Sequence, residues 1–465
     1  MYAQNYKSVY SDKIAYFENQ NGDVKCIRID SVKFQSDSIL FLFKNIQQLG
    51  PDCYTPFGAS WLGNKIIVND SINLFFNKNL DTIKIKINAK LNDKWLVYNY
   101  KDSIKIFATV IKIDTLTFLG LNDSVKTISF QVYNKAMDSL DYDLNKMIII
   151  LSQKYGFVKT LNFYLFPDFK DVSFKNESIE ELTLGGLSVP QVGIKNLMWF
   201  DIHDFQIDDE LHILYEFIDN GFGYSHSETK KTILKYLGRN DSKDSITYLI
   251  DRKLSTQIEN DGAYNFAYIH DTIKSIIKQD TLFNKLPGES IITDHAYSYT
   301  MGSNNTKTEP AIFETIHKSF DSCWSTCCYD GCLPSYEYIK GLGGPYFQCD
   351  NAFSIGGENN ALVYYKKGAK TWGTPLVVNE IKNLTIENKV DLFPNPANDL
   401  LTIKTSESIL PYTLELFNLK GQSVLKTLIS SSTYSLKLDE NLKGIFFYRI
   451  MRNNELIKNG KLVLK

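Results

Sequence analysis

Apolar and polar residues alternate along most of this chain of 465 residues. In residues 82–91, Ile83, Ile85 and Ile87 fall on one side of an extended backbone, and the residues between them, which are polar, fall on the other. A period of two over about four to eight residues is typical of a strand with one buried face. The same alternation recurs in residues 103–113, 115–121, 125–133 and 160–166. The pattern predicts a mainly β fold, with an antiparallel sandwich or barrel-like body.

Breaks in this pattern suggest where domains begin and end. A proline interrupts the alternation in the sequence FPDFKD, and residues 374–390 are polar without sustained alternation, as expected of a linker. We expect an N-terminal β-rich domain in residues 1–167 and a second β-rich region, which contains a cysteine cluster, in residues 168–380. A linker in residues 381–390 is expected to precede a separate module in residues 391–465.

Charge and hydropathy argue against two classes of partner. The net charge is −2, and no run of lysine or arginine forms a basic patch that would attract nucleic acid. No stretch approaches the roughly 18 uninterrupted apolar residues that a membrane-spanning helix needs. We therefore expect no nucleic-acid partner and no transmembrane segment.

The terminal module, residues 391–465, has the pattern of a small independent β domain. It opens with Phe393-Pro394-Asn395-Pro396, where each proline fixes φ near about −65° and pushes the preceding residue toward an extended conformation. Gly421 follows an asparagine-containing corner and is expected to adopt positive φ, which costs little without a Cβ atom. About seven short strands in so few residues predict a small immunoglobulin-like β-sandwich.

The terminal module resembles the type A C-terminal sorting domain of the bacterial type IX secretion system. The matching positions are Phe393, Pro394, Asn395, Pro396, Asn398, Asp399, Gly421, Gly444, Lys461 and Lys465. The resemblance implies an origin in Bacteroidota, the type IX machinery as a partner, and a secreted or outer-membrane-surface location. It also implies a signal peptide, and Tyr2-Ala3-Gln4 after Met1 looks like the end of one that has been removed. The alternative is an immunoglobulin-like sandwich appended for binding.

The rest of the chain resembles uncharacterised passengers of that route, in phrases such as DIHDFQIDDELH and GLGGPYF. These passengers have no agreed activity, so no catalytic, cofactor-binding or metal-binding residue is assigned and no cofactor is expected. We expect an exported or surface-attached protein that binds a glycan, a host protein or a surface protein. The alternatives are a secreted hydrolase, either a glycosidase or a peptidase with an unrecognised active site, and a structural component of a surface layer.

The chain has seven cysteines, and export would place them in an oxidising environment where they form disulfides. The candidates are Cys26, Cys53, Cys323, Cys327, Cys328, Cys332 and Cys349. A bridge between Cys26 and Cys53 would close a loop near the N-terminus, and the later cluster has room for two bridges. Connectivity does not follow from spacing. The alternative is a zinc knuckle on Cys323-x₃-Cys327, but no second pair of ligands follows at a matching spacing.

Eleven triplets of Asp, then Ser or Thr, then an aliphatic residue recur along the chain. Asp favours the turn and the aliphatic residue favours the strand that follows, so the triplet is typical of a turn-to-strand corner. It also resembles the O-glycosylation sequon of exported Bacteroidota proteins. The candidate hydroxyls belong to Ser31, Ser38, Ser71, Thr82, Ser103, Thr115, Ser124, Ser139, Ser245, Thr272 and Thr281.

Residues 201–212 gather two histidines and several carboxylates, which are the side chains of a metal or acid–base site. His203 and Asp204 would point to opposite faces of a strand, however, so the group need not converge. We expect a solvated loop between strands here.

Overall fold

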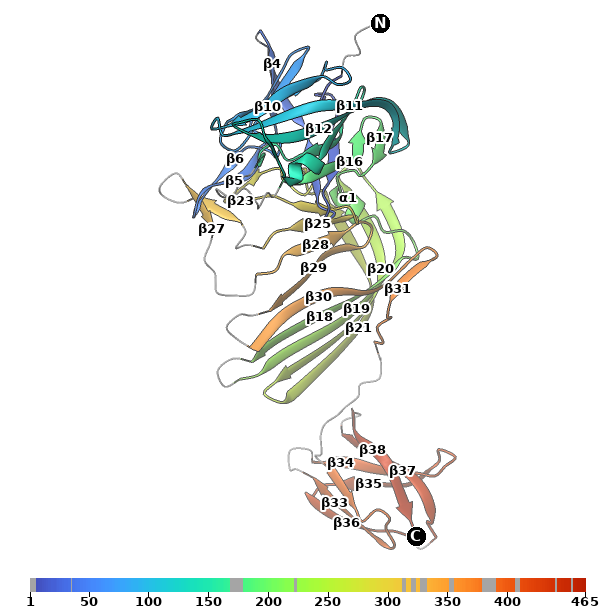
Figure 1. The fold of residues 1–465 in the computed structure, drawn as a ribbon. Helices are drawn as coiled ribbons and strands as arrows, with labels where there is room; N and C mark the ends of the chain where they lie inside the picture. The colour runs from blue at the N-terminus through green and yellow to red at the C-terminus, as the bar shows by residue number, and fades with distance from the viewer. Residues whose placement is uncertain are drawn as a thin grey trace. The chain divides into compact units, whose positions relative to one another are not determined.

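The chain forms two compact units, Met1–Val378 and Asn379–Lys465, which we call the body and the terminal unit (Figure 1). Its coordinates come from a computed structural model. Nearly all of the described structure is strand, and neighbouring strands pair antiparallel, which confirms the mainly β prediction. The structure describes residues 6–34, 36–167, 179–220, 224–311, 315–318, 323–326, 333–350, 355–378, 390–405, 410–439, 441–452 and 455–465.

Two sheets form the N-terminal half of the body. The first comprises β1 (Ala15–Glu18), β2 (Val24–Ile27), β10 (Lys94–Tyr100), β11 (Ile104–Phe118), β12 (Leu121–Asn134), β13 (Ser139–Leu140), β14 (Ile148–Ser152), β15 (Gly156–Leu161), β16 (Glu181–Ser188) and β17 (Gln191–Gly193). The second comprises β3 (Ile29–Phe34), β4 (Ser38–Leu42), β7 (Ile66–Val68), β8 (Ile72–Phe76) and β9 (Thr82–Lys86). The first sheet extends past residue 167, the expected end of the first domain, because β16 pairs with both β1 and β15.

The core between these two sheets accounts for the alternating sequence pattern. Ile83 and Ile85 on β9 are fully buried, and they belong to the same apolar cluster as Ile106 and Val110 on β11. The lysines between the isoleucines of β9 lie outside this cluster, as a strand with one buried face requires. Burial of alternate residues from two facing sheets is the packing of a β-sandwich.

A third sheet contains the longest strands of the body. It comprises β18 (Glu210–Asn220), β19 (His226–Asp241), β20 (Ser245–Asn260), β21 (Ala263–Lys278), β24 (Thr300–Gly302), β25 (Thr306–Glu309), β28 (Tyr336–Ile339), β29 (Gly343–Asp350), β30 (Ile355–Lys367) and β31 (Lys370–Gly373). Its main path runs β21-β20-β19-β18-β30-β29-β28-β25-β24, and the long strands lie side by side in Figure 1.

Part of this third sheet has no covering layer. None of residues 226–235, 252–260 or 263–278 is buried, and these stretches belong to β19, β20 and β21. Successive side chains of a strand point to opposite faces, so both faces of the sheet reach solvent there. We call these three stretches the open region.

Short elements complete the body. A fourth sheet comprises β5 (Asn45–Gly50), β6 (Cys53–Gly58), β22 (Ile291–Ile292), β23 (His295–Tyr297), β26 (Ile316–Lys318) and β27 (Trp324–Thr326). The helical elements among the described residues are α1 (Trp199–Ile202) and the 3₁₀ turn η1 (Asp143–Lys146).

The terminal unit is a β-sandwich of two sheets. One comprises β32 (Val390–Phe393), β33 (Leu400–Thr405) and β36 (Thr433–Lys437), and the other comprises β34 (Tyr412–Phe417), β35 (Ser423–Ile429), β37 (Gly444–Arg452) and β38 (Glu455–Leu464). The first, second and fifth strands of the unit form one sheet, and the other four form the second. This division of strands is immunoglobulin-like, except that the fourth strand belongs to the opposite sheet. A separate apolar cluster that includes Leu401, Leu414 and Ile450 fills the space between them. Of the expected linker, residues 381–389 lie outside the described residues, and Val390 already belongs to β32.

Candidate functional site

The last strand of the chain holds the first motif of the terminal module in place. The side-chain amide of Asn395 donates to the carbonyl oxygen of Lys461 (2.8 Å) and its Oδ1 accepts from the N–H of Val463 (2.9 Å). The backbone of Ala397 bonds to Val463 and to Lys465, each over 2.9 Å. The motif that opens the module and the motif that closes it therefore form one structural unit.

The residues that flank Asn395 end the first strand and begin the turn. Pro394 and Pro396 have no N–H to give to a ladder, so β32 ends at Phe393, whose ring is exposed. Asn398 is exposed, and the carbonyl oxygen of Asp399 accepts from the N–H of Leu438 over 2.8 Å. The extended conformation expected before Pro394 is present at Phe393, and the chain bends after it.

The second motif is a hairpin corner organised by one asparagine. The Oδ1 of Asn418 accepts from the N–H groups of Lys420 and Gln422, each over 3.0 Å. Gly421 has φ of +78°, which confirms the expected positive value, and Gly444 has φ of +108°. A Cβ atom on either glycine would meet nothing within 4 Å, so backbone conformation rather than space favours glycine here.

The third motif begins before β37 and ends on β38, where it presents two charges to solvent. Gly460 pairs with Tyr448 of β37, and a Cβ atom on Gly460 would come within 2.6 Å of the tyrosine hydroxyl. Glycine is therefore needed where the Tyr448 ring crosses the strand. Lys461 and Lys465 are exposed, and Lys461 pairs with the half-exposed Phe447.

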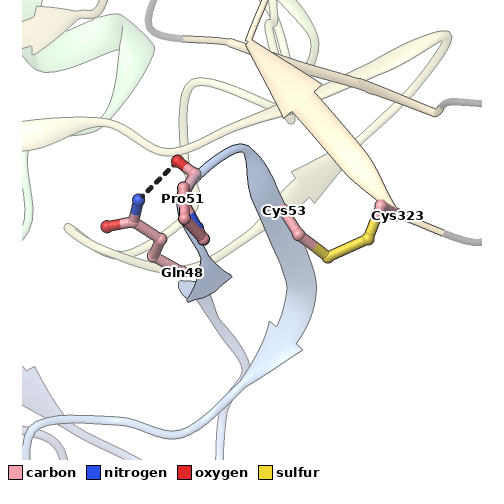
Figure 2. The surroundings of a disulfide bond; sticks show 4 residues. All are labelled: Gln48, Pro51, Cys53 and Cys323. Carbon is pink, nitrogen blue, oxygen red and sulfur yellow. Dashed lines mark hydrogen bonds between the residues drawn. A yellow bond between two sulfur atoms is a disulfide. The ribbon is translucent and has the colours of Figure 1, made fainter.

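A disulfide in the body joins two segments that are far apart in the sequence. Cys53 at the start of β6 bonds to Cys323 beside β27, across a separation of 270 residues (Figure 2). The side-chain amide of Gln48 donates to the carbonyl oxygen of Pro51 over 2.9 Å and closes the turn that leads to Cys53. The bond thereby fastens the β5–β6 hairpin to a strand from the second half of the body.

This pairing excludes the bridge between Cys26 and Cys53 that the sequence left open. Cys26 is a free thiol on β2, only 1% exposed, and its side chain packs in an apolar cluster of the body. Cys53 is half-buried on β6, a strand of another sheet, and its sulfur is already bonded to Cys323. Cys349 is disulfide-bonded. Cys327, Cys328 and Cys332 lie outside the described residues.

The hydroxyls of the Asp-Ser/Thr triplets differ in exposure. Those on exposed residues are Ser31, Ser103, Thr115, Ser139, Thr272 and Thr281, and those on half-buried residues are Ser38, Ser71, Thr82, Ser124 and Ser245. Several triplets have the expected corner geometry, since Ser38, Thr82 and Ser245 each begin a strand. Others, such as Thr115 and Thr272, lie within long strands. Glycosylation at these positions stays a prediction.

The polar residues of 201–212 do not converge on one site. His203 bonds through Nδ1 to a backbone carbonyl of α1 (3.0 Å), and burial lowers the pKa of this imidazole. His212 lies on β18 and bonds to Glu210, while Asp209 accepts from Lys367 over 2.6 Å. Across the described ranges, no three His, Cys, Asp or Glu side chains gather closely enough to hold a metal ion.

A polar pocket of about 350 Å³ lies on the first sheet of the body. In the ladders, Glu18 of β1 faces Thr183 of β16, and Thr183 faces Lys159 of β15. Glu181 lies two residues before Thr183 on the same face, and its Oε1 is 2.9 Å from Lys159 Nζ. Asn19 and Gln20, which follow β1, complete the lining.

A neighbouring carboxylate orients one wall of this pocket. The side-chain amide of Asn19 donates to Glu180 over 2.9 Å, and Asn162 donates to the same carboxylate over 3.0 Å. Burial alone would raise the pKa of Glu180, but hydrogen bonds from Lys25, Asn162 and Asn19 lower it. Glu180 is therefore a fixed negative charge. Sequence reasoning missed the pocket because its walls come from strands that are distant in the chain and carry no recognisable motif.

A fully buried lysine is a second feature that the sequence pattern did not reveal. The side chain of Lys307 on β25 has no exposed surface, and the rings of Phe283 and Tyr299 lie 4.7 and 5.2 Å from Nζ. Its ammonium group donates to Asn196 Oδ1 (3.1 Å) and to the carbonyl oxygens of Leu197 (3.2 Å), Phe283 (2.5 Å) and Lys285 (2.7 Å). Burial lowers the pKa of Lys307 to about 7. The lysine holds two loop segments together, so we assign it a structural role.

One comparison with known proteins identifies the terminal module. Residues 391–465 match the family described as the secretion system C-terminal sorting domain, so this module is a type IX sorting domain. The match covers the three motifs whose geometry is described above. It implies interaction with the type IX machinery and a secreted or cell-surface location. No curated protein and no solved structure matches the chain. No helix among the described residues has the length and apolar content needed to cross a bilayer.

Proposed function

We propose that this is an exported or surface-attached bacterial protein whose body binds a hydrophilic ligand, such as a glycan, outside the cell. The sorting domain at residues 391–465 is the observation that carries the export part of the proposal. The polar pocket on β1, β15 and β16 supports the binding part. In this view the body is the cargo, and the terminal module directs it to the type IX machinery.

The chemistry of the pocket suits a ligand that is rich in hydroxyl groups. Its walls are amides, carboxylates, one lysine and one threonine, which donate to and accept from hydroxyl groups in fixed directions. Its volume of about 350 Å³ lies near the lower end of the range for ligand pockets, which suits one or two sugar units. The ion pair of Lys159 and Glu181 and the bond from Asn19 to Glu180 orient the walls before a ligand arrives.

Calorimetric titration of the full chain with mono- and disaccharides, selected on a glycan array, tests this binding. Thr183→Val and Asn19→Ala each remove a polar group from the pocket. Each should lower the affinity for the selected sugar by about tenfold or more. Glu259→Gln, a change on β20 away from the pocket, is the matched control and should leave the affinity unchanged. A chain that binds no sugar, or pocket variants that bind as well as the control, would exclude this ligand class.

A hydrolase is the second candidate, because Glu18 and Glu181 line the same pocket. Most glycosidases use two carboxyl groups on either side of the scissile bond, one as an acid and the other as a base or nucleophile. Lys159 pairs with Glu181 over 2.9 Å, so we assign Glu18 as the candidate acid. Release of reducing ends from the bound sugar would favour this candidate. Glu18→Gln should then abolish hydrolysis while it retains binding, whereas a pure binding protein would release nothing.

A further inference from the structure

The long strand β21 ends the third sheet of the body and offers its outer edge for pairing. It has sixteen residues, Ala263–Lys278, and pairs with β20 along its whole length without a register shift. In the described strand order no strand lies on its other side. The N–H and C=O groups along an unpaired edge form a template for another strand.

This edge lacks two of the features that usually block such pairing, proline and a bulge, although it carries Asp271, Lys274 and Lys278. It contains no proline and no bulge, and Tyr264, Phe266 and Ile276 are 51%, 47% and 53% exposed on one face. Ile269 is 43% exposed on the other face. The strand lies in the open region, where neither face has a second layer. Long, regular and apolar edges of this kind favour association.

The sequence of β21 is complementary to itself when two copies run antiparallel. With the two-fold axis at Asp271, residues whose numbers sum to the same value face one another across the two copies. Several of the resulting cross-strand pairs are favourable, because aromatic rings face lysines or an isoleucine and two isoleucines face each other. These pairs are Tyr264 with Lys278, Phe266 with Ile276, Tyr268 with Lys274, and Ile269 with Ile273. The remaining pairs, His270 with Thr272, Asn265 with Ile277 and Ala267 with Ser275, place no like charges opposite each other.

Arg252 offsets the like charges on this axis. Asp271 of each copy accepts two bonds from Arg252 of the same copy, at 2.7 and 3.0 Å, so the row across the dimer reads Arg, Asp, Asp, Arg. The two neighbouring registers are less favourable, because the one centred on His270 opposes Ile269 to the carboxylate of Asp271 and the one centred on Thr272 opposes Ile273 to it. A two-fold axis on a residue is required, since antiparallel strands pair residues of matching hydrogen-bond direction.

We propose that the protein forms a two-fold symmetric dimer in which β21 of one copy pairs with β21 of a second copy, centred on Asp271. The third sheet of one copy then continues into the third sheet of the other copy, and the exposed β21 edge of each copy becomes paired. Each contact occurs twice, as in any isologous interface. This inference is independent of the ligand proposed for the pocket, which lies on the first sheet.

Charge substitution at one cross-strand pair tests the dimer. In Phe266→Glu/Ile276→Glu, like charges face each other at two symmetry-related places, and the dimer of the full chain should weaken at least about tenfold in sedimentation equilibrium. Phe266→Glu/Ile276→Lys places opposite charges there and should restore most of the affinity. The two residues are ten positions apart within a strand, so this rescue requires a second copy. Leu249→Glu, an exposed change on β20, is the control and should leave the dimer intact.

A disulfide test fixes the register. Ile269 and Ile273 of one chain are about 13 Å apart along the strand, too far for an internal bridge, but they face each other between two copies. Ile269→Cys/Ile273→Cys should therefore give a covalent dimer on non-reducing gels, and Ile269→Cys alone should not. A full chain that stays monomeric up to about 100 μM, a dimer that the like-charge variant leaves unchanged, or a double-cysteine variant without covalent dimer would each overturn the proposal.

Discussion

The terminal module and the body contrast in how their function is encoded. In the module, two prolines, two asparagines and two glycines set the backbone geometry, and these residues are visible in the sequence. In the body, the pocket depends on contacts such as Asn19 with Glu180, which are 161 residues apart, and the disulfide joins residues 270 apart. A feature that depends on local backbone geometry can be predicted from the sequence before the fold is known. A pocket or a disulfide that distant strands assemble cannot be predicted in this way.

Removal of the disulfide should give the largest difference between the two units in the change of unfolding free energy. Cys53→Ser/Cys323→Ser should lower the stability of the body by about 5 kcal/mol on the chain-entropy model, because the bond closes a very long loop. The terminal unit has its own core and should unfold at an unchanged temperature. Differential scanning calorimetry of the full chain measures both transitions. Cys26→Ala, at a buried free thiol, is the control and should cost about 1 kcal/mol. Equal shifts of both transitions would show that the units are not independent.

The buried Lys307 should also affect the stability of the body alone, because all of its contacts lie within the body. Lys307→Met leaves carbonyl oxygens without their donor and should destabilise the body by about 3 kcal/mol in urea denaturation. Lys84→Met, the same substitution at an exposed lysine, should change the free energy of unfolding by no more than about 0.5 kcal/mol. Equal effects of the two variants would contradict the structural role of Lys307.

The same lysine gives the body a pH dependence of defined sign. Burial lowers the pKa of Lys307 to about 7 in the folded chain, whereas an unfolded lysine titrates near about 10.4. Between these values the unfolded chain binds more protons, so the stability of the body should rise as pH increases from about 7 to about 10. Burial also lowers the pKa of Lys126 to about 8, so Lys307→Met should reduce this rise rather than abolish it. A wild-type stability that falls over the window would contradict the account.

In the module, the two hydrogen bonds between the Asn395 side chain and β38, which we call the clamp, should contribute less to stability than the disulfide or Lys307 does. Asn395→Ala removes two hydrogen bonds to β38 and should destabilise the terminal unit by about 2 kcal/mol, with no change in the body transition. Calorimetry measures the shift, and the amount of protein in the culture medium shows whether sorting depends on the clamp. Lys420→Ala, at the exposed hairpin corner, is the control. Unchanged stability of Asn395→Ala would show that the clamp is dispensable.

Glycosylation should have the smallest effect on folding, because the predicted sites are mostly exposed. We propose that exposed triplet hydroxyls, such as those of Ser103 and Thr115, carry sugars in naturally exported protein. Intact mass spectrometry should then show added hexose-type mass, and Thr115→Ala should remove one site while Thr117→Ala, outside a triplet, should not. Exported protein with the unmodified polypeptide mass would contradict this proposal.

The sequence predicted more of the module than of the body. Alternation identified strands such as residues 82–86, and the positive φ of Gly421 followed from its place in a corner. It did not show that β16 returns to β1, because period-two patterns carry no information about which strands pair. Cysteine spacing likewise left the connectivity open, because the partner of Cys53 is set by the β6–β27 ladder. Lys307 has no sequence signal at all, because burial of a lysine depends on oxygen atoms from distant loops.

We propose that residues 391–465 direct the body out of the cell. The most direct measurement compares the full chain with a chain that ends at residue 390, both expressed with a signal peptide in a bacterium that has type IX secretion. Quantitative immunoblots of periplasm, cell surface and medium should place the full chain outside and the truncated body in the periplasm. Truncated body outside the cell in the same amount as the full chain would contradict the account.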